Sequence, residues 1–197
     1  MKYVENLPPI KDINNHDVFE IASKKHHYTH AFFKYPARFI PEIPNWFLRN
    51  FTKEKEVILD CFCGSGTTLV EAGLMSRVPL GIDFDPLSQL LTNTKTKHLK
   101  KNEIQFIKDI YKELIKPCAD TSYPDIENLD HWFNKKNKKN LSNIITNINN
   151  LNTTNKNIIN FLLTAFASII RKSSNADQVS PKPYVSSKVK ITPKDAN

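Results

Sequence analysis

The sequence predicts an α/β fold built on a parallel sheet, and two observations carry this prediction. A short apolar run over residues 56–62 ends in a glycine turn, and a helical pattern follows over residues 67–75. A second apolar run over residues 78–83 is followed by Pro86, a residue favoured in the first turn of a helix. Strand, turn, helix, strand and helix in this order begin a doubly wound parallel sheet.

The individual elements follow from length and periodicity. The runs 56–62 and 78–83 are short, apolar and bounded by turn residues, as buried strands are. Upstream of them, Trp46, Phe47 and Phe51 fall at helical spacing, and we expect all three in the core.

The second half of the chain is expected to be helical. Apolar residues recur at helical spacing over 141–151, and residues 158–170 are apolar almost throughout, which predicts an amphipathic helix followed by a buried one. The basic run 135–139 is expected to be exposed. We therefore divide the chain into an N-terminal motif with an α/β unit (1–116), an Asn/Lys-rich helical segment (117–172) and a loop with a flexible tail (173–197).

Composition limits the classes of protein that fit. The chain has 197 residues, 40% of them hydrophobic, and a net charge of +8, which excludes a disordered protein. The positive charge indicates a polyanion such as nucleic acid as partner, and a basic surface without such a partner fits as well. No run approaches the ~18–20 apolar residues that span a bilayer. Three cysteines cannot form a disulfide framework, so we expect a cytoplasmic protein with no membrane contact.

The glycine turn is the most informative part of the sequence. Gly64 and Gly66 let a ligand approach the backbone at a helix N-terminus. The third glycine of a dinucleotide fingerprint is replaced by Leu69, which disfavours NAD and FAD. Asp60 and Asp83 end the two strands, where carboxylates can hold an ammonium group and ribose hydroxyls. A ligand with ribose, an amine and no phosphate fits both acids, and S-adenosylmethionine is the candidate.

A simpler interpretation of this turn stays open. The glycines could make only a tight turn, with Asp83 as a helix cap. Metal binding by Cys61, Cys63, Cys118 and the histidines His26, His27 and His30 is disfavoured, because C-x-C without a second close pair is not a usual zinc spacing. We instead expect His30 to order the segment around it through a hydrogen bond.

At these residues the sequence resembles a known family. Residues 60–68, Asp-Cys-Phe-Cys-Gly-Ser-Gly-Thr-Thr, resemble the cofactor motif D-P-F-x-G-S-G-T-T of the amino-group DNA methyltransferases, which modify cytosine N4 or adenine N6. Cys61 replaces the proline of that motif. Residues 81–83 resemble the following G-I-E/D motif, and residues 30–41 resemble the upstream cofactor motif. Residues 166–184 resemble, more weakly, a stretch of cytosine-N4-type members.

The resemblance implies a Rossmann-like S-adenosylmethionine-dependent fold, here partial, with a helical C-terminal part. It also implies a cofactor site on three segments. Its expected residues are Lys34, Tyr35, Pro36, Asp60, Cys61, Phe62, Gly64, Gly66, Thr67, Asp83 and Phe84.

The family's catalytic motif, [DNS]-P-P-[YFW], does not occur in these 197 residues, where Pro-Pro stands only at Pro8-Pro9. In that motif, polar groups hold the target amine and the aromatic ring stacks on the flipped base. We assign no catalytic residue. The hypothesis is a cofactor-binding part of a DNA methyltransferase of a restriction-modification system, with a second chain carrying the catalytic motif. The alternatives are a non-catalytic DNA-binding or regulatory remnant and a methyltransferase of RNA or protein.

Overall fold

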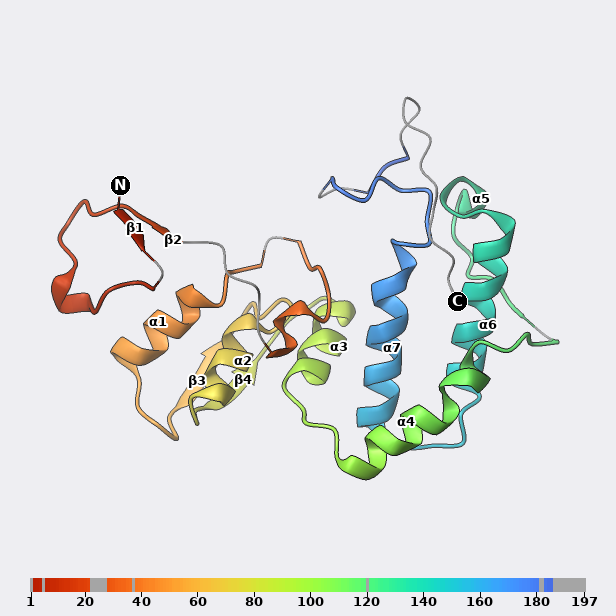
Figure 1. The fold of residues 1–197 in the computed structure, drawn as a ribbon, viewed down its shortest axis with the longest axis horizontal. Helices are drawn as coiled ribbons and strands as arrows, with labels where there is room; N and C mark the ends of the chain where they lie inside the picture. Colours follow the sequence, from red (N-terminus) through yellow and green to blue (C-terminus); the bar gives the residue numbers. More distant parts are fainter. Residues whose placement is uncertain are drawn as a thin grey trace. The chain divides into compact units, whose positions relative to one another are not determined.

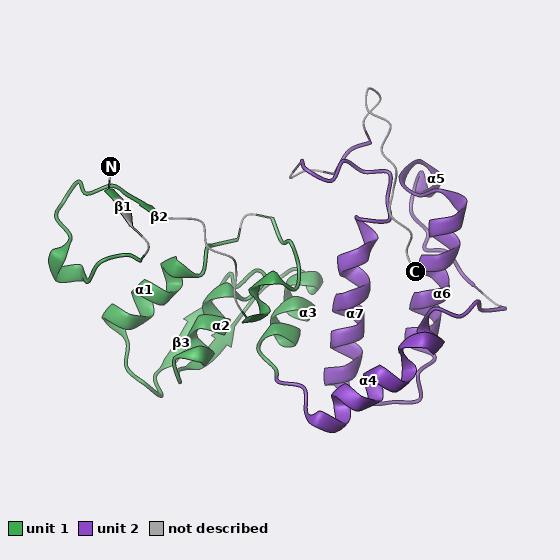
Figure 2. Cartoon of the chain, viewed as in Figure 1, with its two compact units in different colours: residues 1–97 green, residues 98–197 purple. Residues whose placement is uncertain are grey.

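The computed structural model describes residues 2–4, 6–21, 28–36, 38–119, 121–180 and 183–185. The chain forms two compact units, residues 1–97 and 98–197 (Figure 2). The boundary lies before the one expected at residue 116, because helix α4 (Lys101–Leu114) packs on helix α6 of the second unit. Among the described residues, no helix has the length and apolar character needed to cross a membrane.

The first unit contains the expected βαβα order. Strand β3 (Val57–Asp60) leads through the glycine turn to helix α2 (Thr67–Leu74), and strand β4 (Val78–Gly81) leads to helix α3 (Pro86–Lys95) (Figure 1). The two strands pair in parallel, with Asp60 opposite Gly81. Their carboxyl ends therefore lie together, as a ligand site of such a sheet requires.

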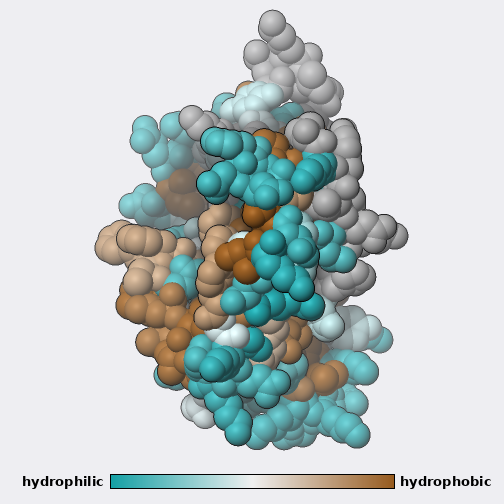
Figure 3. Space-filling model, turned by 90° about the vertical axis from the view of Figure 1, so that its left-hand side faces the viewer, coloured by the Kyte–Doolittle hydropathy of each residue, from teal (hydrophilic) through white to brown (hydrophobic). Residues whose placement is uncertain are grey.

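Helix α2 covers one face of the β3–β4 pair and leaves the other open. Leu69, Val70 and Ala72 of α2 are buried, and a Cβ added to Gly81 would meet the Leu69 side chain at 2.3 Å. On the opposite face, each aliphatic side chain is more than half exposed: Val57, Leu59, Val78, Leu80 and Ile82. Apolar side chains gather toward the left of Figure 3. A parallel sheet is ordinarily covered on both faces, so we name these five residues the open sheet face.

Shorter elements precede the sheet. Strands β1 (Lys2–Val4) and β2 (Phe19–Ile21) form a separate parallel pair. The 3-10 helix η1 (Ile10–Asp12) follows β1 in the chain, and the 3-10 helix η2 (Tyr28–Ala31) follows β2. Helix α1 (Glu42–Phe51) packs on α2.

The expectation that all three aromatic residues of α1 are core residues is wrong. Phe47 and Phe51 are 54% and 58% exposed and stack on each other with centroids 5.8 Å apart. Trp46 is partly buried and donates its indole N–H to the Pro8 carbonyl. Helical spacing identified one face of α1, but the face that packs on α2 carries the buried Pro44 and Leu48 instead.

The second unit is helical. Its helices are α4, the short α5 (Leu129–Trp132), α6 (Lys135–Asn149) and α7 (Lys156–Ile170). Its core joins Leu114 of α4 to Ile144 and Ile148 of α6 and to Ile158 and Leu162 of α7. The amphipathic helix expected at 141–151 is confirmed but begins earlier. The basic run 135–139 forms its first turns, because Asn134 caps the helix by accepting from the Asn137 N–H at 2.8 Å.

The segment after α7 is a loop, as expected, but its first residues are not loosely held. Ser173, Ser174 and Ala176 are at most 4% exposed. The Asn137 side chain donates to the Ser173 carbonyl at 2.9 Å, and the Asn175 N–H donates to the Trp132 carbonyl at 2.7 Å. Of the loop and flexible tail expected over 173–197, residues 181–182 and 186–197 lie outside the described residues.

Candidate functional site

The site is built at the carboxyl ends of β3 and β4, where the glycine turn meets the segment after β4. Gly64 has a φ of 49° and Gly66 a φ of 79°, values that strain any residue with a Cβ. The Gly64 N–H donates to Oδ2 of Asp83 at 2.7 Å, and the Asp85 N–H donates to Oδ1 of Asp83 at 2.9 Å. Asp83 thus joins the two strand ends.

Asp83 is not a helix cap. The cap of α3 is Asp85, whose Oδ1 accepts from the Leu87 N–H at 3.0 Å. This backbone hydrogen bond is the main reason why the pKa of Asp85 lies below its usual value. Asp60 accepts from the Phe62 N–H through Oδ1 at 3.1 Å. Within the described ranges, neither Asp60 nor Asp83 forms an ion pair.

The upstream segment is tied to the site by Tyr35. Its hydroxyl lies 2.7 Å from Oγ of Ser88 and donates to Oδ2 of Asp85 at 3.0 Å. A Cβ added to Gly64 would lie 3.7 Å from the Tyr35 ring. The ring therefore lies beside the glycine turn, and an alanine side chain would have space there.

A second tie runs from the upstream segment to α2. The buried His30 ring shares a hydrogen bond with Oε1 of Glu71 at 2.7 Å, while the Asn45 side chain donates to Oε2 at 2.7 Å. The expectation that His30 orders its segment through a hydrogen bond is confirmed. His26 and His27 lie outside the described residues. In the described part of the chain, no three His, Cys, Asp or Glu side chains group as metal ligands.

The other residues expected in the cofactor site differ in their exposure to solvent. Phe62 and Phe84 are 90% and 100% exposed, so both rings are free to stack on a ligand. Lys34, Pro36 and Cys61 are exposed as well. Thr67 is 5% exposed, so little of this residue is accessible to a ligand. The structure thus brings Tyr35, the glycine turn and Asp83 together.

Sequence reasoning missed the residues that support this site from α3. Thr92 donates to the Gly64 carbonyl at 3.0 Å, and Lys95 donates to the Ser65 carbonyl at 2.9 Å. A Cβ on Gly66 would lie 2.7 Å from Oγ1 of Thr92. The spacing of Thr92 and Lys95, one helical turn apart after the strand, is a signal that could have indicated them.

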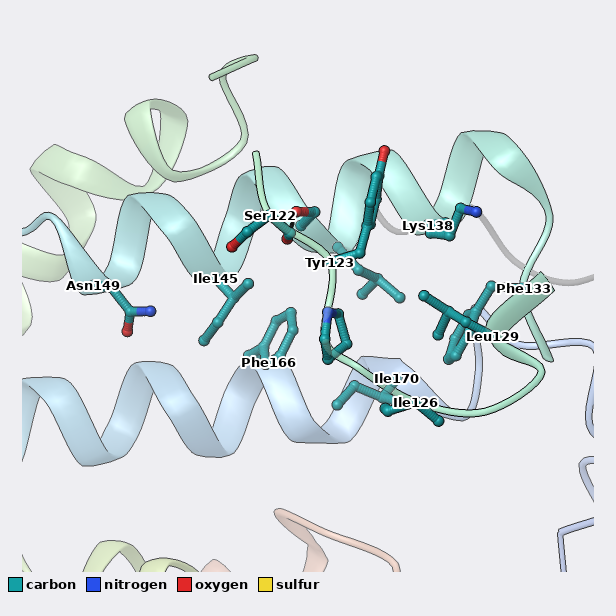
Figure 4. A pocket seen from close by; sticks show the side chains of 13 residues that line it. Ser122, Tyr123, Ile126, Leu129, Phe133, Lys138, Ile145, Asn149, Phe166 and Ile170 are labelled. Atoms are coloured by element: carbon teal, nitrogen blue, oxygen red, sulfur yellow. Dashed lines mark hydrogen bonds between the residues drawn. The ribbon is translucent and has the colours of Figure 1, made fainter. Parts of the chain in front are cut away.

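The second unit holds a cavity of about 400 Å³ between α6, α7 and the segment 122–133 (Figure 4). Tyr123, Phe133 and Phe166 line it, and the Lys138 ammonium lies 5.1 Å from the centroid of the Tyr123 ring. Phe133 is part of this apolar lining. The Ser142 hydroxyl, which also lines the cavity, donates to the Ser122 carbonyl at 2.5 Å.

Comparison with known proteins finds similarity to DNA methyltransferases. Residues 5–91 match the N6_N4_Mtase model, described as DNA methylase. The chain is 32% identical over 128 residues to the type II methyltransferase M.MjaII of Methanocaldococcus jannaschii, covering 60% of this chain and 24% of that protein. It is 26% identical over 159 residues to the type II methyltransferase M.MvaI of Kocuria varians, covering 75% and 35%.

Among solved structures, the cytosine-N4-specific PvuII DNA methyltransferase is 25% identical with a TM-score of 0.37, covering 49% of this chain and 36% of that one. The chain spans about a quarter and about a third of the length of the two curated relatives. Over residues 5–91, the chain is thus similar to the DNA methylases that the N6_N4_Mtase family model describes.

Proposed function

We propose that the first unit binds S-adenosylmethionine and is the cofactor-binding part of a DNA methyltransferase that modifies N4 of cytosine or N6 of adenine. The observation that carries the proposal is the contact of Gly64 with Asp83 at 2.7 Å. This hydrogen bond holds the glycine turn and the Asp83 carboxylate together at one edge of the sheet. The curated relatives are type II methyltransferases, which supports a role in a restriction-modification system.

The residues present fit this cofactor. Asp60 and Asp83 offer carboxylate oxygens without competing ion pairs in the described chain, as an ammonium group and ribose hydroxyls require. Phe62 and Phe84 are free to cover an adenine ring, and the Tyr35 ring leaves space at Gly64. When bound, the cofactor supplies a methyl group activated by its sulfonium. The work of these residues is then to orient it.

We further propose that methyl transfer needs a segment carrying the catalytic motif, which packs on the open sheet face. Five aliphatic side chains there are more than half exposed, and a parallel sheet with one bare face lacks the layer that ordinarily covers it. The two curated relatives are about three to four times as long as the parts that match. Such a segment could belong to the same protein or to a second chain. The cytoplasmic location stays a prediction.

The test is calorimetry with S-adenosylmethionine on the full chain, together with methylation of plasmid DNA. We expect cofactor binding that is lost in Asp83→Ala and retained in Asp109→Ala, a change on the exposed surface of α4. We expect no methylated DNA from this chain alone. Salt-sensitive DNA binding without any heat from the cofactor would instead support the DNA-binding alternative. Methylation of RNA or protein, without methylation of DNA, would support the alternative of an RNA or protein methyltransferase.

A further inference from the structure

Lys95 is a buried cation that the proposed cofactor chemistry does not use. It ends α3 and is 4% exposed. Its ammonium group donates to the Ser65 carbonyl at 2.9 Å, and its own carbonyl accepts from the Thr29 hydroxyl at 3.0 Å. The side chain therefore reaches from α3 to the middle of the glycine turn.

No carboxylate of the described residues pairs with Lys95. Glu71 on α2 is engaged by His30 and Asn45, and Asp83 accepts from two backbone N–H groups. The charged group that acts on Lys95 is Arg38, which has the same sign. Burial disfavours the charged ammonium and Arg38 adds repulsion, so the pKa of Lys95 falls to about 8. A buried charge without a counter-ion costs stability, so a function is expected at the atom that it contacts, the Ser65 carbonyl oxygen.

That atom belongs to the backbone next to the expected ligand. Thr92 and Lys95 hold two successive carbonyls, those of Gly64 and Ser65. Since the carbonyl and the N–H of a trans peptide point in opposite directions, holding the Gly64 carbonyl toward α3 turns the Ser65 N–H away from α3. The peptide planes of the turn are thus set from α3 and not by the turn alone.

We propose that Lys95 is a positioning residue of the cofactor site, whose buried ammonium holds the glycine turn, through the Ser65 carbonyl, in the conformation that receives the cofactor. The inference rests on the proposed binding of S-adenosylmethionine. A charged donor makes a stronger hydrogen bond than a neutral amine. The turn is therefore held most firmly while Lys95 is protonated.

The test compares Lys95→Met with Lys97→Met, an exposed lysine nearby, in the full chain. We expect Lys95→Met to weaken binding of S-adenosylmethionine about tenfold, equivalent to ~1.4 kcal/mol, and Lys97→Met to leave it unchanged. Because methionine removes a buried charge, the melting temperature of Lys95→Met should equal or exceed that of the parent. Loss of affinity without loss of stability separates positioning from a general structural role.

A pH series from 6.5 to 9.5 adds a second readout. The parent should lose affinity above about pH 8, the pKa of Lys95. The α-amino group of the cofactor titrates near 7.7–8.0 as well, and Lys95→Met retains that part of the profile only. Equal affinities and superimposable pH profiles for parent and Lys95→Met would overturn the inference. Absence of cofactor binding by the parent would overturn the proposed function instead.

Discussion

Replacing Gly66 by alanine tests whether the glycine turn has the conformation described. Gly66 has a φ of 79°, and an added Cβ would lie 2.7 Å from Oγ1 and 3.2 Å from Cα of Thr92. The left-handed backbone costs an alanine ~1–2 kcal/mol, and overpacking against the backbone of α3 adds about 1–3 kcal/mol. We therefore expect the free energy of unfolding of the first unit to fall by roughly 2–5 kcal/mol.

Two other glycines supply matched controls. Gly64→Ala has the same backbone strain at a φ of 49°, but its Cβ would lie an ordinary 3.7 Å from the nearest atom, so only about 1–2 kcal/mol should be lost. Gly73 lies inside α2 with no atom near an added Cβ. Gly73→Ala should gain about 0.5–1 kcal/mol, because glycine is a poor helix former.

The assay is urea unfolding followed by tryptophan fluorescence in a Trp132→Phe background. Trp46 on α1 is then the remaining tryptophan and reports on the first unit, because α1 packs on α2. The expected order of stability is Gly73→Ala, parent, Gly64→Ala and Gly66→Ala, from highest to lowest. A Gly66→Ala protein as stable as Gly64→Ala would refute the reasoning, since the contact with α3 would then cost nothing.

Three further changes test the contacts around the site and in the second unit. Tyr35→Phe removes the hydroxyl shared with Asp85 and Ser88 and should weaken cofactor binding severalfold by calorimetry, whereas Tyr28→Phe, at a residue 71% exposed, should not. Glu71→Gln weakens the buried contact with His30 and should lower the unfolding free energy of the first unit by ~1–3 kcal/mol, measured by urea unfolding. Backbone donation from Lys100 holds the pKa of Glu103 below its usual value, so the second unit should lose stability as the pH falls below about 4.3. Glu103→Gln should flatten that acid limb in circular dichroism, while the exposed Glu113→Gln should retain it.

Local chemistry was enough to predict the βαβα unit. Apolar runs with a glycine turn and a proline restrict the backbone over a few neighbouring residues, and β3, α2, β4 and α3 form where those signals lie. The same signals predicted the glycine turn and Asp83, because strand ends of a parallel pair meet at one edge. The start of α6 was missed because its Asn134 cap precedes a run of lysines, which resembles exposed loop.

Tertiary structure decided which groups support the site and which faces remain open. His30 meets Glu71 and Lys95 meets Ser65 across 41 and 30 positions of the chain, separations at which periodicity carries no information. Helical spacing could group Trp46, Phe47 and Phe51 but could not tell which side of α1 packs on α2. The sequence by itself determined the turn and its acids, since these depend on neighbours in the chain. Only packing determined that a buried lysine holds the turn, because that contact exists once α3 folds back against it.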